Sequence, residues 1–152
     1  MFRGANAINL DTKGRLAIPS RYRDVLKTRS TGQLVVTVNN TKERCLWMYP
    51  LDEWQSVEEK LVNLPSFDAN HQRLKRFLIG YASEIEMDKS GRVLLPAPLR
   101  EFARLEKATY LVGQGNKFEI WNEELWNARC SEWIQDDSEP GTLSTEMEQL
   151  SL

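Results

Sequence analysis

The chain has 152 residues, of which 41% are hydrophobic and 28% are charged. This length supports one ordinary domain with its own core, and the composition excludes collagen-like, coiled-coil and fully disordered chains. No apolar run approaches the roughly 20 residues of a membrane helix, and the first residues lack the features of a secretory signal, so we expect a cytoplasmic protein with no membrane contact. Cys45 and Cys130 form no CxxC motif, so we expect neither a disulfide framework nor a metal site.

The charge is unevenly distributed along the chain, although the net charge is only −2. Residues 1–29 hold seven basic and two acidic side chains, a net of +5. Residues 131–152 hold six acidic side chains and no basic one, a net of −6. Local charge sets the electrostatic field that a polyanion meets. The N-terminal segment therefore suits a nucleic-acid partner, even though the whole chain is slightly acidic.

An internal repeat covers most of the chain. Residues 11–23 align without gaps on residues 88–100, at an offset of 77. Both copies contain Asp-x-x-Gly-Arg, followed by three apolar residues and a proline. With a shorter loop in the second copy, residues 46–49 fall on residues 118–121. The sequence therefore contains two copies of one small structural unit.

Each copy has the pattern of a strand, a turn, a second strand and a short helix. Apolar and polar residues alternate before the turn, and a proline ends the second strand, at Pro19 in the first copy. Ser20 is the predicted cap of a helix in which Tyr22, Val25 and Leu26 have helical spacing. Further strands are predicted over residues 34–38, 46–49, 110–112 and 118–121.

An aspartate and a glycine define the turn in each copy. Asp11 and Asp88 stand at the first position, where a carboxylate accepts a backbone N–H two residues on. Gly14 and Gly91 stand at the fourth position, which favours a positive φ. Turn formation and DNA recognition are alternative roles for the aspartates. Turn formation is favoured, because a carboxylate is repelled by phosphate.

Three more helices are predicted outside the repeated pattern. Residues 51–64 and residues 68–81 each carry an apolar face, and Asp68 begins the second helix. Asn122 is the predicted cap of a third helix, whose apolar stripe consists of Leu125, Trp126, Cys130, Trp133 and Ile134. The acidic end of the chain is predicted to be a flexible tail, with at most a short helix that uses Leu143, Met147 and Leu150.

One copy, of about 45 residues, is too small to bury its apolar faces alone, so the two copies must pack on each other. We predict an α+β, β-rich fold in which two β-hairpin units form a core about a pseudo-two-fold axis, with peripheral helices. The predicted organisation is repeat 1 over residues 5–52, linker helices over 53–80, repeat 2 over 81–124, a C-terminal helix over 125–137 and the acidic tail over 138–152.

The paired Asp-x-x-Gly-Arg motifs and the opening Met-Phe-Arg-Gly resemble the MraZ family of bacterial transcriptional regulators. The resemblance covers essentially the whole chain, including the ending Gln-Leu-Ser-Leu. It implies a fused pair of AbrB-like, swapped-hairpin DNA-binding modules. It further implies a regulator that binds direct repeats in double-stranded DNA upstream of its own cell-division and cell-wall operon. Such a regulator acts as a homo-oligomeric ring in the cytoplasm, associated with the nucleoid.

The predicted DNA-binding side chains are all basic. Arg15 follows the first turn, where its guanidinium could contact guanine edges or phosphates. For Arg15 and its counterpart Arg92, a salt bridge to the aspartate of the same turn is the alternative. Residues 84–107 hold five basic and five acidic side chains, so we expect the first copy to make most DNA contacts. Additional phosphate contacts are expected from Lys13, Arg3, Arg21 and Arg23.

An enzymatic function finds little support in the sequence. The only histidine, His71, lies among polar residues of a predicted helix and is expected to face solvent. No GxSxG, P-loop or HExxH motif occurs, so we predict no catalytic residue, metal or cofactor. The second hypothesis is a protein-interaction scaffold or antitoxin-like partner-binding module, because AbrB-like hairpins also occur in antitoxins. Of the two hypotheses, only a DNA reader requires Arg15.

Overall fold

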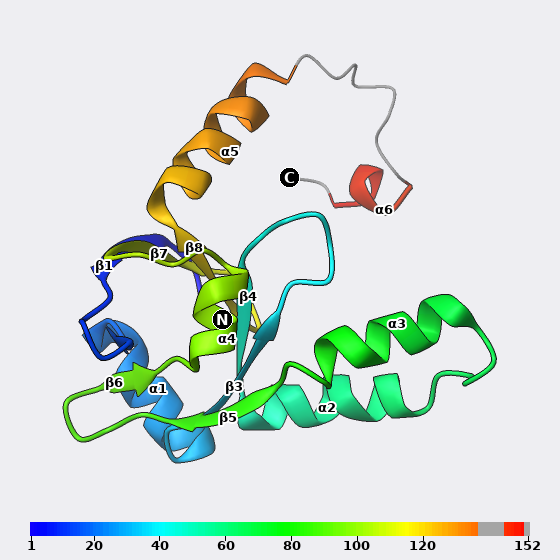
Figure 1. The fold of residues 1–152 in the computed structure, drawn as a ribbon, viewed down its shortest axis with the longest axis horizontal. Coiled ribbons are helices and arrows are strands. Elements are labelled where there is room, and N and C mark those ends of the chain that lie inside the picture. Colours follow the sequence, from blue (N-terminus) through cyan, green and yellow to red (C-terminus); the bar gives the residue numbers. More distant parts are fainter. Residues whose placement is uncertain (137–144, 151–152) are drawn as a thin grey trace.

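The computed structural model describes residues 1–136 and 145–150. Its strands are β1 (Ala5–Asn9), β2 (Arg15–Ala17), β3 (Gln33–Val38), β4 (Leu46–Pro50), β5 (Ser83–Glu86), β6 (Arg92–Leu94), β7 (Ala108–Gly113) and β8 (Phe118–Asn122). Its helices are α1 (Ser20–Ser30), α2 (Leu51–Val62), α3 (Ala69–Leu78), α4 (Ala97–Phe102), α5 (Glu123–Gln135) and α6 (Thr145–Glu148). The strands form a β-rich core with helices around it (Figure 1), which confirms the predicted α+β class.

The strands form a six-stranded antiparallel sheet in the order β1-β7-β8-β4-β3-β5 and a separate two-stranded ribbon of β2 and β6. When each strand is replaced by the equivalent strand of the other copy, the same sheet order results in reverse. Thus β1 of the first copy pairs with β7 of the second, and β5 of the second pairs with β3 of the first. The pairing of β4 with β8 lies at the centre. The predicted pseudo-two-fold arrangement is therefore present.

The pairing of the strands differs from a simple local hairpin. Leu10 and Leu16 form one isolated bridge across the first turn. Beyond this bridge, β1 pairs with β7 and β2 pairs with β6, so both strands find their main partners in the other copy. A three-residue strand offers few backbone hydrogen bonds to its own hairpin, and its counterpart β6 completes the ladder. The predicted strand, turn and strand are present, but the strands are exchanged between copies.

The main hydrophobic core takes side chains from both copies. Three aromatic rings pack together at one side of it, with the ring centroid of Phe118 4.3 Å from that of Phe2 and 5.0 Å from that of Tyr22. Because the same cluster holds buried residues from each copy, neither copy has a complete core of its own. Its fully buried members include Leu16, Ile18, Leu26, Leu34, Val93, Leu95, Phe118 and Ile120.

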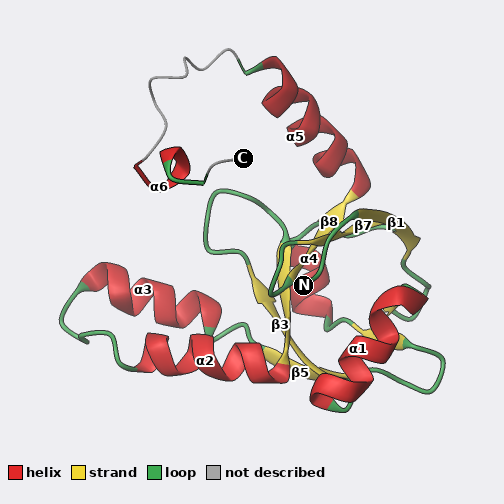
Figure 2. Ribbon diagram, turned by 180° about the vertical axis from the view of Figure 1, so that it is seen from behind, coloured by secondary structure: helices red, strands yellow, loops and turns green. Residues whose placement is uncertain are grey.

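The linker helices α2 and α3 form a hairpin that projects from one end of the molecule (Figures 1 and 2). Asp68 caps α3 as predicted, because its carboxylate accepts hydrogen bonds from the backbone N–H groups of Asn70 and His71. The hairpin packs on the sheet through a second core, whose buried residues are Val35, Tyr49, Trp54, Leu61 and Leu78. These contacts agree with the apolar faces predicted for both helices.

Two local predictions were wrong. Ser20 is the first residue of α1 and not its cap. Pro19 occupies the cap position with φ −53° and makes no side-chain capping bond, because its ring has no acceptor atom. Val25 is 46% exposed, because only Tyr22 and Leu26 of its helix face reach the core. His71 is partly exposed, and its Nδ1 atom lies 3.2 Å from the carbonyl oxygen of Pro65 at the surface.

The C-terminal helix α5 begins at Asn122, whose side chain accepts a hydrogen bond from the backbone N–H of Leu125, as predicted. Its predicted apolar stripe is only partly covered. Trp133 packs perpendicular to Trp121 with ring centroids 6.3 Å apart, whereas Ile134 is 84% exposed. In the acidic segment, α6 is a short helix that contains Met147, while residue 143 lies outside the described residues. None of the described helices is long and apolar enough to cross a membrane.

Replacing Leu16 by alanine tests the burial of one ribbon face. Leu16 is fully buried, so Leu16→Ala is expected to lower the free energy of unfolding by about 2–5 kcal/mol. Leu94 is 56% exposed on the paired strand, so Leu94→Ala is the matched control and should change stability by about 0.5 kcal/mol or less. Urea unfolding followed by tryptophan fluorescence measures both changes. Equal losses would contradict the two-faced ribbon.

Candidate nucleic-acid interface

The ribbon of β2 and β6 turns one face to the core and the other outward. Leu16 and Val93 stand opposite each other and are both fully buried. Neighbouring residues of a strand point to opposite sides, so the residues next to these two share the outer face. Each copy therefore contributes one motif arginine to the same outer surface. This surface consists of Arg15 opposite Leu94 and Ala17 opposite Arg92.

Asp11 builds the first turn through both of its carboxylate oxygens. Its Oδ1 atom accepts hydrogen bonds from the backbone N–H groups of Lys13, at 2.9 Å, and Arg15, at 2.8 Å. Its Oδ2 atom accepts a bond from the Nε of Arg15 at 2.7 Å. The backbone N–H of Gly14 closes the turn on the carbonyl oxygen of Asp11 at 3.1 Å. This is the turn-forming role that the sequence favours.

The second turn repeats this geometry. Oδ1 of Asp88 accepts from the backbone N–H groups of Ser90 and Arg92, both at 2.9 Å, and Oδ2 accepts from the Nε of Arg92 at 3.0 Å. The salt bridges that stood as the alternative role of Arg15 and Arg92 are thus both present. Each uses the Nε atom, so the outer edge of the guanidinium, with its two Nη groups, is not part of the bond. The aspartate holds the arginine and leaves this edge for an external acceptor.

These contacts lower the pKa of both aspartates. The backbone N–H of Arg15, followed by its guanidinium and the backbone N–H of Lys13, lowers the pKa of Asp11 below its ordinary value of 3.8. The backbone N–H and guanidinium of Arg92 have the same effect on the pKa of Asp88. Hydrogen bonds to the ionised form favour ionisation and outweigh the opposing desolvation. Both carboxylates therefore stay charged and keep their arginines in place.

The glycines of the turns lie where the two copies meet. Gly14 and Gly91 adopt positive φ values of +86° and +76°. A Cβ atom at Gly14 would lie 2.8 Å from the guanidinium of Arg100, and one at Gly91 would collide with the side chain of Arg23. In each case the approaching arginine belongs to the other copy. Both turns therefore need glycine for its backbone conformation and for this close approach.

Arg23 was predicted to contact phosphate, and in the structure its side chain also supports the ribbon. Its Nε atom donates a hydrogen bond to the carbonyl oxygen of Ile18 at 2.6 Å while its side chain lies against the turn of the other copy. Arg100 donates in the same way to Leu95 at 3.0 Å. The offset of 77 makes these two arginines counterparts. They hold the ends of the ribbon strands against the opposite turns.

The remaining predicted residues surround the first turn and α1. Lys13 is exposed at the turn itself. Arg3 is exposed, and its carbonyl oxygen accepts a hydrogen bond from the hydroxyl of Tyr22. Arg21 lies over the Tyr22 ring, 4.8 Å from its centroid, and its guanidinium donates to the side-chain oxygen of Asn6. Tyr22 thus contacts both the backbone of Arg3 and the guanidinium of Arg21.

Sequence reasoning missed two residues of this surface. Lys89 is exposed in the second turn, where it supplies the positive charge that Lys13 supplies in the first. Arg100 holds the ribbon in the same way as Arg23. The gapless repeat could have identified Arg100, because it aligns directly with Arg23. Lys89 aligns with Thr12, so only the charge of the whole turn could have identified it.

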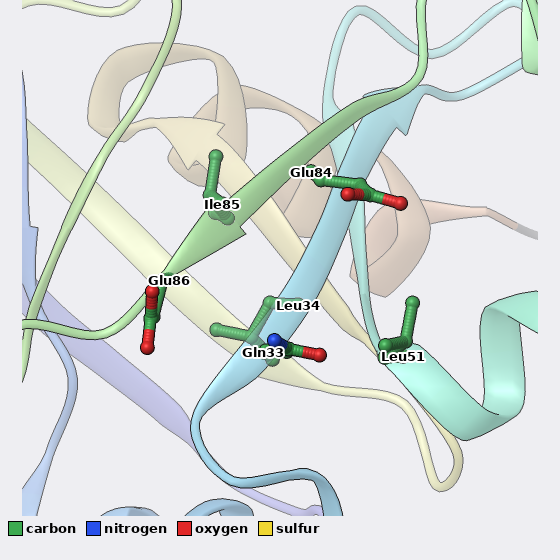
Figure 3. A pocket seen from close by; sticks show the side chains of 6 residues that line it. All are labelled: Gln33, Leu34, Leu51, Glu84, Ile85 and Glu86. Atoms are coloured by element: carbon green, nitrogen blue, oxygen red, sulfur yellow. The ribbon is translucent and has the colours of Figure 1, made fainter.

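The cavity beside β3 and β5 and the cysteines do not have the properties of a phosphate-binding or catalytic site. A cavity of about 230 Å³ beside β3 and β5 is lined by Glu84 and Glu86, which repel phosphate (Figure 3). Burial, followed by the charge of Glu119, raises the pKa of the Cys45 thiol, so this cysteine is not poised as a nucleophile. Both cysteines are free. Among the described residues, no cluster of His, Cys, Asp and Glu could hold a metal ion.

Comparison with known proteins identifies close relatives along the whole chain. Residues 1–77 and 78–144 match the protein-family model described as "MraZ protein, putative antitoxin-like". A protein of Halorhodospira halophila named Transcriptional regulator MraZ is 50% identical over 153 residues. Proteins of the same name from Pseudomonas fluorescens (strain Pf0-1) and Pseudomonas savastanoi pv. phaseolicola are each 53% identical over 152 residues. Each alignment covers 100% of this chain and 100% of the relative.

Replacing both turn aspartates tests their role through pH. Asp11→Asn combined with Asp88→Asn is expected to destabilise the protein at neutral pH, because the charge-assisted bonds to Arg15 and Arg92 are lost. The folded-state pKa values are lowered, so the stabilisation is complete above the ordinary value of 3.8 and disappears as the pH falls through the folded-state pKa. The difference in unfolding free energy between wild type and variant should therefore shrink in acid.

The matched control is Asp24→Asn, which makes the same chemical change on the exposed surface of α1. It should leave the neutral-pH stability close to that of the wild type. Chemical unfolding at a series of pH values measures all three proteins. A wild-type-to-variant difference that persists unchanged in acid would contradict the proposed turn chemistry.

Proposed function

Because the chain belongs to the MraZ family, we propose that it is a DNA-binding regulator of transcription that reads its site with the ribbon of β2 and β6. The family is one of transcriptional regulators, and the chain is not an enzyme. One observation carries the proposal: Arg15 and Arg92 lie on the outer face of a single two-stranded ribbon, each anchored by an aspartate through Nε.

The ribbon has the shape and chemistry of a major-groove reader. The major groove of B-form DNA admits a two-stranded ribbon, and arginine makes bidentate bonds to the O6 and N7 atoms of guanine. The bond from Nε to the aspartate fixes each guanidinium before DNA arrives, so less side-chain freedom is lost on binding. The outer Nη edges of Arg15 and Arg92 are then the base-reading groups.

Phosphate contacts would fix the position of the ribbon on the duplex. Lys13 and Lys89 project from the two turns, at the ends of the ribbon. Arg3 and Arg21 form a second basic group around Tyr22. Such contacts supply affinity that depends on salt but carry little sequence information. The main role of Arg23 is to support the ribbon, and any phosphate contact that it makes is secondary.

The first copy is proposed to make most of the DNA contacts. The two turns carry the same charge, since each holds one aspartate, one lysine and one arginine. The difference lies next to them: at the offset of 77, Gly80 replaces Arg3 and Pro98 replaces Arg21. The second copy therefore lacks both members of the basic group around Tyr22. This local difference supports unequal roles for the two copies.

We further propose that the protein acts as a homo-oligomeric ring on direct repeats upstream of its own cell-division and cell-wall operon, in the cytoplasm at the nucleoid. One ribbon offers only two base-reading arginines, so a single subunit should bind weakly. Several linked subunits on repeated sites bind more tightly, because each later contact forms at a raised effective concentration. The exposed Trp133 and Ile134 of α5 offer apolar surface for assembly.

Substitution of Arg15 tests DNA reading. We expect Arg15→Ala to weaken binding to a duplex from upstream of the operon by about 1–3 kcal/mol. Arg15→Lys keeps the charge but loses the bidentate fork, so it should reduce the preference over a scrambled duplex more than it reduces affinity. Arg76→Ala, an exposed arginine of α3, is the control for lost charge. Fluorescence anisotropy at two salt concentrations measures each variant.

The outcomes separate the two hypotheses for this protein. Equal binding to both duplexes by the wild type would overturn sequence-specific reading. No binding to either duplex by correctly folded protein would favour the alternative, a protein-interaction scaffold or antitoxin-like partner-binding module. An Arg76→Ala variant as weak as Arg15→Ala would show that only the net charge matters.

The proposed inequality of the copies gives a separate prediction. Arg92→Ala is expected to weaken duplex binding less than Arg15→Ala, because the second copy lacks the neighbouring basic group. The two variants lose the same side chain from equivalent positions, so each controls for the other. The same anisotropy titration measures both. A larger loss for Arg92→Ala would reverse the proposed assignment.

A further inference from the structure

A second basic surface lies beside the α2–α3 hairpin, whose place in the fold is seen in Figure 1. A cavity of about 260 Å³, open to solvent, is lined by the loop between β3 and β4, by α3 and by the end of α4. An adjoining cavity of about 210 Å³ shares Asn40, Arg73 and Phe77 with it. We call these two cavities the basic groove. The charged residues that line the groove are Lys42, Arg44 and Arg73, with no carboxylate among them.

Two of these cations lie on aromatic rings. The guanidinium of Arg44 lies 4.9 Å from the centroid of Phe102, and that of Arg73 lies 5.8 Å from the centroid of Phe77. A guanidinium over a ring is attracted through its face, which leaves its N–H groups at the edge for other acceptors. The two rings thus orient the arginines without neutralising them.

The acidic residue of the same loop does not neutralise the groove. Glu43 accepts a hydrogen bond from the Nε of Arg129, on α5, at 2.9 Å, and a second bond from the same guanidinium. Glu43 is thus paired with Arg129 of α5 and does not line the groove. Three like charges around one hollow repel one another, and a bound anion would remove this repulsion.

The loop that carries Lys42 and Arg44 is held in place by its own buried side chain. The Oδ1 atom of Asn39 accepts bonds from the backbone N–H and the hydroxyl of Thr41, at 2.8 and 2.7 Å. Its Nδ2 atom donates to the sulfur of Cys45 at 3.3 Å. The loop is therefore shaped before any ligand binds, which lowers the entropy cost of binding.

We propose that the basic groove binds a nucleoside phosphate. The phosphate would accept charge-assisted bonds from Arg44, Arg73 and Lys42. The rings of Phe102 and Phe77 hold the guanidinium groups of Arg44 and Arg73, and the outer plane of a guanidinium is a surface on which a nucleobase stacks. The side-chain amides of Asn40 and Asn70 are suited to base edges. The phosphate can belong to a free nucleotide or to a nucleic-acid backbone. This proposal does not depend on DNA reading by the ribbon.

Calorimetric titration of the full chain with adenosine 5′-monophosphate, at constant ionic strength, tests the site. Binding is expected, with adenosine at least roughly tenfold weaker because it lacks the phosphate. Arg44→Gln and Arg73→Gln should each weaken binding of the nucleotide roughly tenfold or more. Arg76→Gln is the matched control, since it removes the same charge from α3 but lines neither cavity. Thermal unfolding confirms that each variant is folded.

A duplex of unrelated sequence distinguishes the two sources of phosphate. Duplex binding that depends on Arg44 and Arg73, without binding of the nucleotide, would support a backbone site. Nucleotide binding that survives Arg15→Ala would show that the groove works independently of the ribbon. The proposal would be overturned if neither probe depends on Arg44 and Arg73, or if Arg76→Gln weakens binding as much as they do. The proposal would also be overturned if a synthetic peptide of residues 137–152 binds through Arg44 and Arg73 while the nucleotide does not bind. The acidic tail would then be the ligand of the groove.

Discussion

Each copy of the repeat depends on backbone hydrogen bonds from the other copy. The N–H of Ile18 donates to the carbonyl oxygen of Gly91 at 2.8 Å, and the N–H of Leu95 donates to that of Gly14 at 2.9 Å. These bonds join the end of each ribbon strand to the opposite turn. With the pairing of β1 to β7 and β3 to β5, they make two incomplete units into one domain. A single copy would lack strand partners as well as half of the core.

This exchange explains why the arginines of the motif are so well placed. Pairing of β2 with β6 buries Leu16 against Val93, and the alternation of the strands then puts Arg15 and Arg92 on the outer face. The aspartate of each turn holds its arginine through Nε. The two guanidinium groups are thus positioned by the hydrophobic core on one side and by an ion pair on the other, so little is left to the flexibility of long side chains.

The distribution of charge follows the same architecture. The basic residues of the first copy gather around the ribbon and the start of α1, while Glu84 and Glu86 line a cavity beside β3. Beside the α2–α3 hairpin, the basic groove combines a loop of the first copy with the linker helix α3 and with α4 of the second copy. A chain with a net charge of −2 therefore presents two separate surfaces suited to phosphate.

Residues close in sequence determined much of the structure by themselves. The repeat, the positions of Asp11 and Gly14 in the turn, and the apolar faces of the linker helices were predicted, because turns and helix faces depend on neighbours within a few residues. Only the tertiary structure decided that β2 pairs with β6, that Arg23 supports Ile18, and that Arg44 and Arg73 share a groove. The strand pairing and the groove join residues that are distant in sequence, and the Arg23 bond turns a side chain back toward its own ribbon strand. Hydrophobic periodicity does not specify which partner a strand or a side chain contacts.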